Sequence, residues 1–393
     1  MKRCILAMVF AIAVAGVTLQ VGVAQDSTAA QIARVEGPQS PNRQGFDPYT
    51  LPEIMKRFHV PGVSIAVVHD FQVQWTKTYG VADVATHAPV IPDTRFQAAS
   101  ISKPATAFAV LRAVEAGRLS LDENVNTYLK SWKVPQNEYT RGGVTLRALL
   151  SHTSGTADGF GFPGYNPSAP LPTLDQILDG KPPSNVGPVF WARPPFAAYE
   201  YSGGGIVIVQ MVLQDVYGKP FAQIMQDTVL GPLGMTNSTY QQPLPPAEDK
   251  FAARAHDSGG KAMDAKWHVY PEQAAAGLWT TPTDLAKLGI ELQKALRGES
   301  KLLGHATALE MVAPTGTGPF AIGFSIVNKG QGWYFTHSGG NWGFRCDLLM
   351  HRLKGYGVVV MTNNDSGGEI LDEIESRLAA AANWDTLDKA VPR

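Results

Sequence analysis

A serine and a lysine with two residues between them occur twice in the chain, as Ser100/Lys103 and as Ser258/Lys261. A serine hydroxyl is a poor nucleophile until a neighbouring base takes its proton, and a neutral lysine amine is one such base. On a helix this spacing puts both side chains on one face, one turn apart. Ser100 opens a stretch with helical periodicity, whereas Ser258 and Lys261 enclose two glycines, which is typical of a turn. We therefore expect Ser100 to be the nucleophile, although without the further motifs below a simple helix N-cap would be the better explanation.

Lys103 can act as a base near neutral pH only if its pKa lies well below the reference value of about 10.4. A fall of about 3 units corresponds to about 4 kcal/mol, of which a helix N-terminus contributes only about 0.3–1 kcal/mol. Burial and a nearby cation or phenol must supply the rest. The same helix start presents the backbone N–H of Ser100 as a donor to an oxyanion.

Two further motifs follow along the chain. Tyr201-Ser202 precedes a run of three glycines and a helical pattern, and His337-Ser338-Gly339-Gly340 follows the strand-like residues 333–336. Each has an ordinary structural explanation, namely a packed tyrosine before a turn and a β-turn with a solvent-facing histidine. The glycines would also let a substrate approach the backbone.

Other classes of function lack their sequence signals. No Gly-x-Ser-x-Gly is present, which disfavours the nucleophile elbow of α/β-hydrolases. None of the nine histidines falls in His-Glu-x-x-His, so we expect no metal, and no motif indicates a cofactor. The formal net charge is −1 and no basic block occurs, which disfavours nucleic-acid binding.

Taken together and in order, these motifs resemble those of the penicillin-recognising serine hydrolases, in particular the branch of class C β-lactamases, DD-peptidases and related esterases. The matching motifs are Ser100-x-x-Lys103, Tyr201-Ser202 and His337-Ser338-Gly339. Further family-like stretches lie at residues 61–66, 149–155, 231–235 and 276–278. The resemblance covers roughly residues 50–380 and implies a β-lactamase/transpeptidase-like fold of the α+β class.

The resemblance also implies roles for these residues. Ser100 would attack the carbonyl, and Lys103 and Tyr201 would share proton removal and delivery, with either one as the base. The backbone N–H groups of Ser100 and Gly340 would form the oxyanion hole. The substrate would lie along the strand that carries His337, Ser338 and Gly339.

Two positions depart from the family pattern. Gly203 stands where the family has an asparagine that contacts the lysine and the acyl-amide of the substrate, and His337 stands where β-lactamases have lysine. An exposed histidine is mostly neutral at pH 7 and attracts a substrate carboxylate less than lysine does. Arg345 is a candidate for the missing cation, or else it pairs with Asp347 on the same strand face.

These departures favour a serine acyl hydrolase that acts on esters or on peptides containing D-amino acids. One alternative is a weak class C-like β-lactamase. An alternative from another class is a non-catalytic regulatory or binding protein that keeps the fold. The expected partners are small ester, peptide or β-lactam substrates, without nucleic acid.

The surrounding pattern predicts an antiparallel sheet built from both termini, with flanking helices and a helix-rich inserted domain. The expected sheet domain comprises residues 48–95 and 270–385, and the expected insertion comprises residues 96–269. The segments that carry this prediction are a hairpin at 63–79, helices at 100–117, 206–216, 281 onward and 369–382, and a strand at 358–361.

The N-terminus is typical of a secretory signal at residues 1–24, with Lys2 and Arg3 before an apolar run and small residues near the end. An uncleaved membrane anchor is the alternative. After cleavage we expect a periplasmic or secreted protein without stable membrane insertion. Residues 25–47 are expected to be a linker that contributes no core. Cys346 would remain as a buried, inert thiol.

Overall fold

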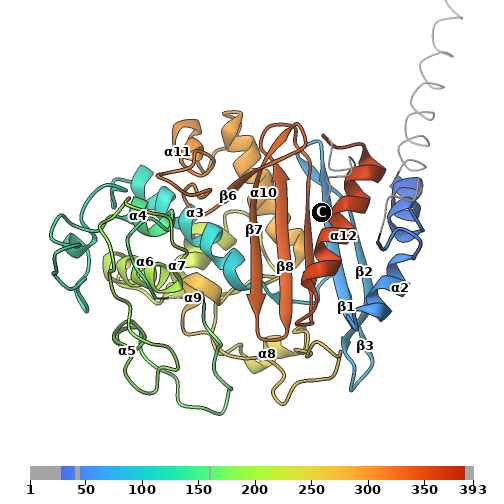
Figure 1. Cartoon of the computed structure of the whole chain (residues 1–393), viewed down its shortest axis with the longest axis horizontal. Coiled ribbons are helices and arrows are strands. Elements are labelled where there is room, and N and C mark those ends of the chain that lie inside the picture. The colour runs from blue at the N-terminus through green and yellow to red at the C-terminus, as the bar shows by residue number, and fades with distance from the viewer. Residues whose placement is uncertain (1–27, 40–44, 159–160, 386–393) are drawn as a thin grey trace, which may run out of the picture.

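The computed structural model describes residues 28–39, 45–158 and 161–385 (Figure 1). Its main sheet has seven strands in the order β3-β2-β1-β9-β8-β7-β6, and every neighbouring pair is antiparallel. The strands are β1 (Gly62–His69), β2 (Gln72–Asp83), β3 (Ala88–Pro89), β6 (Ser325–Lys329), β7 (Gly332–Asn341), β8 (Phe344–His351) and β9 (Gly357–Thr362). Because β1 pairs with β9, the sheet joins strands from both ends of the chain, as predicted.

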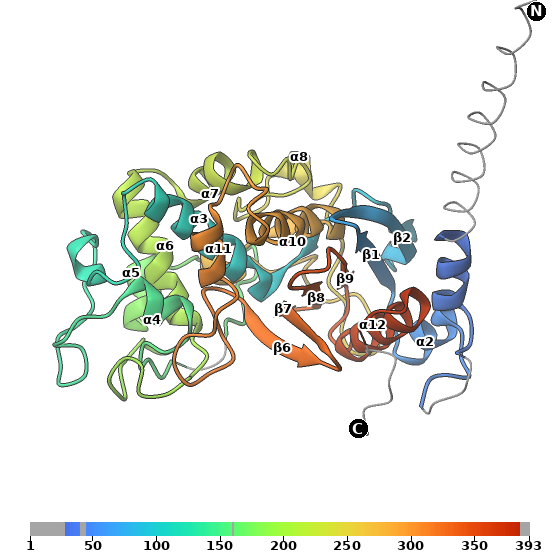
Figure 2. The same cartoon turned by 90° about the horizontal axis from the view of Figure 1, so that it is seen from above.

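Helices cover both faces of this sheet (Figure 2). On one face lies α10 (Pro282–Leu296), and on the other lie α2 (Leu51–Arg57) and α12 (Gly368–Ala382). The remaining helices are α3 (Ser102–Glu115), α4 (Leu146–Leu150), α5 (Leu174–Asp179), α6 (Gly203–Tyr217), α7 (Phe221–Met225), α8 (Pro246–Asp249), α9 (Gln273–Ala276) and α11 (His305–Glu310). A small second sheet pairs β4 (Phe96–Gln97) with β5 (Trp279–Thr280). This arrangement confirms the α+β class.

The larger hydrophobic core runs through both of the expected domains. It includes Phe108 of α3 and Val207 of α6 together with Leu285 of α10 and Met361 of β9. Since the segments on both sides share one continuous core, the core does not mark the expected boundaries at residues 95/96 and 269/270. That division stays a prediction.

Capping residues explain where the long helices begin and end. The Thr281 hydroxyl accepts a hydrogen bond from the backbone N–H of Asp284 at the start of α10. The Ser202 hydroxyl does the same for Gly205 at the start of α6, and α6 ends at Gly218 with a φ of 63°. The helix predicted after Tyr201 therefore begins two residues after this candidate site residue, with Ser202 as its N-cap.

Residues 25–47, expected to be a linker without core residues, contribute to the core where the structure describes them. The expectation is therefore wrong for this part of the chain. Residues 28–36 are helical, and Val35 is fully buried in a cluster with side chains of α2 and α12. Gln31 accepts a hydrogen bond from the indole N–H of Trp75 at 2.7 Å. The buried Arg377 guanidinium donates to the carbonyls of Val35 and Gly37. One apolar helix side is enough to dock a segment that is polar on average.

The predicted signal at residues 1–24 lies outside the described residues. Within the part of the chain that the structure describes, no helix has the length and apolar character needed to cross a membrane.

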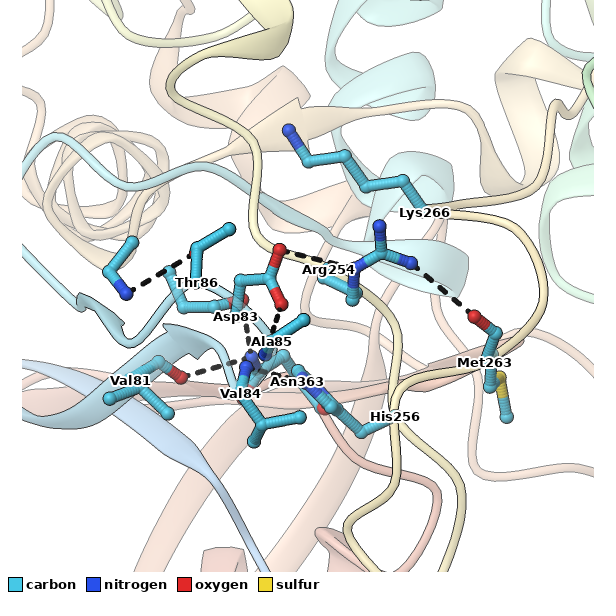
Figure 3. Close-up of polar contacts among 12 residues, drawn as sticks. Val81, Asp83, Val84, Ala85, Thr86, Arg254, His256, Met263, Lys266 and Asn363 are labelled. Atoms are coloured by element: carbon cyan, nitrogen blue, oxygen red, sulfur yellow. Dashed lines mark hydrogen bonds and ion pairs between the residues drawn. The ribbon is translucent and has the colours of Figure 1, made fainter.

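A buried histidine ties the ends of two strands to a long loop (Figure 3). His256 donates from Nδ1 to the carbonyl of Asn363, and its Nε2 accepts from the backbone N–H of Val84. The Asn363 amide in turn donates to the carbonyl of Val81. Asp365, two residues after Asn363, donates its backbone N–H to the carbonyl of His256. These bonds fix the turn after β9, whose Asp365 lines the cleft described below.

Candidate active site

Ser100 lies in a single 3₁₀ turn, Ala99–Ile101, immediately before α3. Ala99 has a φ of 49°, a conformation that is rare for a residue with a Cβ atom and recurs at functional sites. The Ser102 hydroxyl donates to the carbonyl of Ala99 at 2.6 Å and accepts from the backbone N–H of Leu278 at 3.0 Å. The strained turn is therefore held from both sides, with Ser100 at its centre.

Lys103 is buried directly beside this serine. Its Nζ donates to the Ser100 hydroxyl at 2.9 Å and to the carbonyl of Ala275, in α9, at 3.0 Å. Burial lowers the pKa of Lys103 to about 7, although the nearby Asp158 carboxylate acts to raise it. The lysine thus has the environment that the sequence argument required of a base.

Tyr201 completes this group from the residue before the α6 cap. Its ring centroid lies 4.9 Å from Nζ of Lys103, and its hydroxyl is hydrogen-bonded to Ser100. Burial raises the pKa of the Tyr201 phenol above its usual value, which the hydrogen bond to Ser100 opposes. The three residues singled out in the sequence are brought together, with a neutral phenol next to a readily neutralised amine.

A half-buried carboxylate and a buried imidazole hold the segment that follows Tyr201. Asp158 accepts hydrogen bonds from the Ser202 hydroxyl and from the backbone N–H of Gly204. His152 accepts from the backbone N–H of Ser202 at 3.2 Å, and its ring centroid lies 4.2 Å from that of Tyr201. His152 therefore supports the tyrosine. Sequence reasoning missed Asp158, because nothing in the irregular stretch around it distinguishes it from other loop carboxylates.

The third motif, His337-Ser338-Gly339-Gly340, lies inside β7 and does not form a turn after the strand. Gly339 lets this strand press against the nucleophile turn, since a Cβ there would lie 2.3 Å from the carbonyl oxygen of Ala98. Cys346 of β8 is fully buried at the same contact, where its thiol donates to the Ala98 carbonyl. Ser338 and Gly340 face the cleft.

His337 is buried, which corrects the expectation of an exposed ring. The rings of Tyr201 and Phe320 lie beside it, with centroids 6.2 and 5.6 Å away, and only 4% of the residue is accessible. Burial lowers its pKa to about 3, and the positive charge of Lys103 acts in the same direction. Nδ1 lies 2.7 Å from the carbonyl oxygen of Ser338, so the neutral ring donates from that nitrogen. His337 is therefore neutral, as expected, but because of its burial and not because of the reference pKa of an exposed histidine.

Arg345 does not pair with Asp347, contrary to one of the two expectations for it. The guanidinium forms an ion pair with Asp365 at 3.1 Å and donates to the carbonyls of Asn341 and Phe344, both at 2.7 Å. Asp347 instead accepts from Thr336. The two residues share a strand face, but the Arg345 side chain extends towards the turn after β9.

These residues border one cleft of about 790 Å³ that has both aromatic and charged lining. Beside Ser100 and Tyr201 the wall is aromatic, formed by Phe162, Tyr199, Phe320 and Trp342. The charged lining residues are Lys329, Arg345, Asp347, Asp365 and Asp372. Among the residues with described positions, no cluster of histidine, cysteine and carboxylate side chains is suited to hold a metal ion.

The second Ser-x-x-Lys pair lies apart from this cleft. Residues 258–260 form a turn in which Asp257 accepts hydrogen bonds from the backbone N–H groups of Gly259 and Lys261. Ser258 is therefore a turn residue, as predicted.

Comparison with known sequences identifies relatives over most of the chain. The model of the β-lactamase family matches residues 50–382. Protein flp of Staphylococcus aureus (strain MW2) is 24% identical over 322 residues, which cover 79% of this chain and 61% of that protein. Unguisins hydrolase ungD' of Aspergillus campestris is 29% identical over 361 residues, which cover 84% of this chain and 64% of that protein. The chain thus spans less than two thirds of the length of these relatives.

Solved structures share the fold at low sequence identity. D-amino acid amidase from Ochrobactrum anthropi SV3 superposes with a TM-score of 0.68 at 21% identity, covering 85% of this chain and 98% of that one. A β-lactamase/D-alanine carboxypeptidase from Yersinia pestis gives a TM-score of 0.63 at 21% identity, covering 86% and 97%. These likenesses confirm the β-lactamase/transpeptidase-like fold. With the family model matched across most of its length, the chain belongs to the β-lactamase family of serine hydrolases.

Proposed function

We propose that the protein hydrolyses esters through a covalent acyl-enzyme at Ser100. The observation that carries this proposal is the 2.9 Å hydrogen bond between the Ser100 hydroxyl and Nζ of Lys103, a buried amine with a pKa of about 7. About half of such an amine is neutral at pH 7, where it can take a proton.

The surroundings favour a division of labour between the two proton carriers. Neutral Lys103 takes the Ser100 proton as the oxygen attacks the carbonyl carbon, and the Tyr201 phenol gives its proton to the departing alkoxide as the ester C–O bond breaks. The lysine ammonium then returns a proton to the phenolate. Water hydrolyses the acyl-enzyme by the reverse path, with Ser100 leaving as the protonated alcohol. Backbone N–H groups of Ser100 and Gly340 are the proposed oxyanion donors.

The pH dependence of the reaction tests this assignment. Since Lys103 must be neutral, kcat/KM for a nitrophenyl ester should rise with pH along a limb with an apparent pKa near 7. The Asp158 carboxylate raises the pKa of Lys103, so Asp158→Asn should move that limb to lower pH. Asp122→Asn is the matched control, because Asp122 pairs with Arg147 at the surface. A limb that stays in place in Asp158→Asn would remove Lys103 from the role of base.

Substrate preference follows from the groups that surround Ser100. A substrate carboxylate needs a cation, but His337 is neutral. The two cations that line the cleft are already in ion pairs, Arg345 with Asp365 and Lys329 with Glu375. Gly203 provides no side chain for an acyl-amide. Simple esters need only the nucleophile, the proton carriers and the oxyanion hole, so they suit the site better than β-lactams.

A second candidate is the hydrolysis of amides or peptides of D-amino acids. The structural neighbour from Ochrobactrum anthropi is a D-amino acid amidase, which supports this candidate. Export to the periplasm or the medium remains a proposal from the N-terminal sequence alone.

A substrate panel separates these possibilities. Turnover of a short-chain nitrophenyl ester should exceed that of a chromogenic cephalosporin and of a D-Ala-D-Ala peptide at matched concentration. His337→Lys should raise the cephalosporin-to-ester ratio about ten- to a hundredfold, the worth of one charge-assisted hydrogen bond. A lysine is long enough to extend its ammonium from this buried position into the cleft.

The control for this panel is His69→Lys, which adds the same charge at an exposed position at the end of β1. Faster wild-type turnover of the cephalosporin, or an unmoved ratio in His337→Lys, would contradict the proposed preference. Failure of a fluorophosphonate to label the protein at all would favour the non-catalytic alternative.

A further inference from the structure

An aromatic ring occupies the space next to Gly203, the position without a side chain at the start of α6. A Cβ atom at Gly203 would lie 2.8 Å from Cε2 and 3.2 Å from Cζ of Phe162. Phe162 comes from a separate loop, and it lines the same cleft as Ser100. The Phe162 ring therefore fills the space that a side chain at residue 203 would need.

The loop that carries Phe162 is held on its C-terminal side by several contacts. The carbonyl of Pro163 accepts hydrogen bonds from Nδ1 of His268 at 3.0 Å and from the Tyr270 hydroxyl at 3.5 Å. Tyr165 and Val269 exchange two backbone hydrogen bonds of 2.8 Å. Gly164, between Pro163 and Tyr165, has a φ of 72°, and a Cβ there would lie 2.6 Å from the Tyr270 ring. The ring of Phe162 is thus positioned by the fold.

The ring continues the aromatic wall of the cleft. Tyr199 and Phe320 are stacked, with centroids 5.7 Å apart and an interplanar angle of 14°. Trp342 stacks on His268 at 3.8 Å, the same histidine that holds Pro163. Phe162, Tyr199, Phe320 and Trp342 thus give the cleft that contains Ser100 a wall of four aromatic side chains, and the nearby His337 is neutral.

We propose that Phe162 determines the acyl specificity of the enzyme, closing the polar subsite beside Gly203 and forming an apolar subsite with Tyr199, Phe320 and Trp342. The substrate class is then esters with a hydrocarbon acyl chain, and an acylamino group next to the carbonyl is disfavoured. A polar amide placed against the ring would lose its hydrogen bonds to water without replacement. This inference rests on the proposed ester hydrolysis at Ser100.

The test compares kcat/KM for nitrophenyl acetate, nitrophenyl hexanoate and the nitrophenyl ester of N-acetyl-D-alanine. Phe162→Ala should lower the hexanoate-to-acetate ratio about tenfold, because the longer chain loses its apolar partner. It should raise the ratio of the acetylalanyl ester to the hexanoate by at least the same factor. Phe162→Leu keeps an apolar side chain and should give intermediate ratios, which preserves the test if the alanine variant does not fold.

A double-mutant cycle checks the link to Gly203. Gly203→Ala should push the ring into the cleft and lower the hexanoate-to-acetate ratio, but it should have little further effect when Phe162 is already alanine. Phe190→Ala is the control, since Phe190 is an aromatic residue of a neighbouring loop that is 53% exposed.

The possible outcomes separate the two proposals. Ratios within twofold of wild type in Phe162→Ala and Phe162→Leu, with ester turnover and Ser100 labelling retained, would overturn the specificity role alone. Equal effects of Gly203→Ala in both backgrounds would overturn the packing link. A wild-type protein that neither turns over esters nor forms an adduct at Ser100 would overturn the proposed function itself.

Discussion

Ser100→Ala is expected to reduce ester hydrolysis to the uncatalysed background, a loss of about four orders of magnitude or more. The substitution removes the attacking oxygen and its hydrogen bonds to Lys103 and Tyr201 while leaving the strained turn at Ala99 in place. Activity should be followed as kcat/KM with a nitrophenyl ester, and folding as the midpoint of thermal unfolding.

The second Ser-x-x-Lys pair supplies the control for this variant. Ser258→Ala should retain full activity, because Ser258 lies in a turn organised by Asp257. Intact mass and peptide mapping of a fluorophosphonate adduct locate the nucleophile independently of kinetics. An adduct on any residue other than Ser100 would disprove the assignment, as would residual turnover in a folded Ser100→Ala protein.

Local sequence signals were sufficient for the elements that frame this site. Spacing placed Ser100 and Lys103 on one face, and the structure shows their side chains in contact. Cap and breaker residues predicted the start of α10 and the end of α6 within one or two residues. Such signals are readable because each depends on residues within one or two helical turns.

The parts of the site that sequence did not predict depend on contacts between distant segments. The carbonyl of Ala275 holds Lys103 across 172 positions, and Asp158 reaches the start of α6 from an irregular loop. Phe162 has no periodic neighbours, and its place beside Gly203 follows from contacts of the next residues with Tyr270 and His268.

Two errors in side-chain environment have the same origin. Alternation along β7 fixes that His337 and Ser338 point to opposite faces, but it does not say which of the two side chains is buried by residues from other segments. The strand spacing correctly put Arg345 and Asp347 on one face, yet the partner of Arg345 is Asp365 in the turn after β9. Pairing across a turn of this kind requires the sheet order, which no single segment encodes.

Tyr201→Phe removes the phenolic hydroxyl but keeps the ring, and it is expected to lower the acylation rate with an ethyl ester about a hundredfold or more. The phenylalanine ring keeps its packing against His152 and its place over Nζ of Lys103. The loss should therefore report the proton carrier and not a collapsed site. Because Lys103 remains beside Ser100, the rising limb of the pH profile should stay near a pKa of 7.

The leaving group tells which proton Tyr201 carries. If its phenol protonates the departing alkoxide, the loss should be greater for an ethyl ester than for a nitrophenyl ester, since nitrophenolate leaves without protonation. Tyr217→Phe, at the far end of α6, removes a hydroxyl without touching the cleft and should leave both rates unchanged. Near-normal turnover of both esters by a folded Tyr201→Phe protein would return Tyr201 to the role of a packed aromatic. An equal loss of rate with both esters would mean that Tyr201 takes the proton from Ser100 instead. That step comes before the leaving group departs, so it does not depend on which leaving group the ester has.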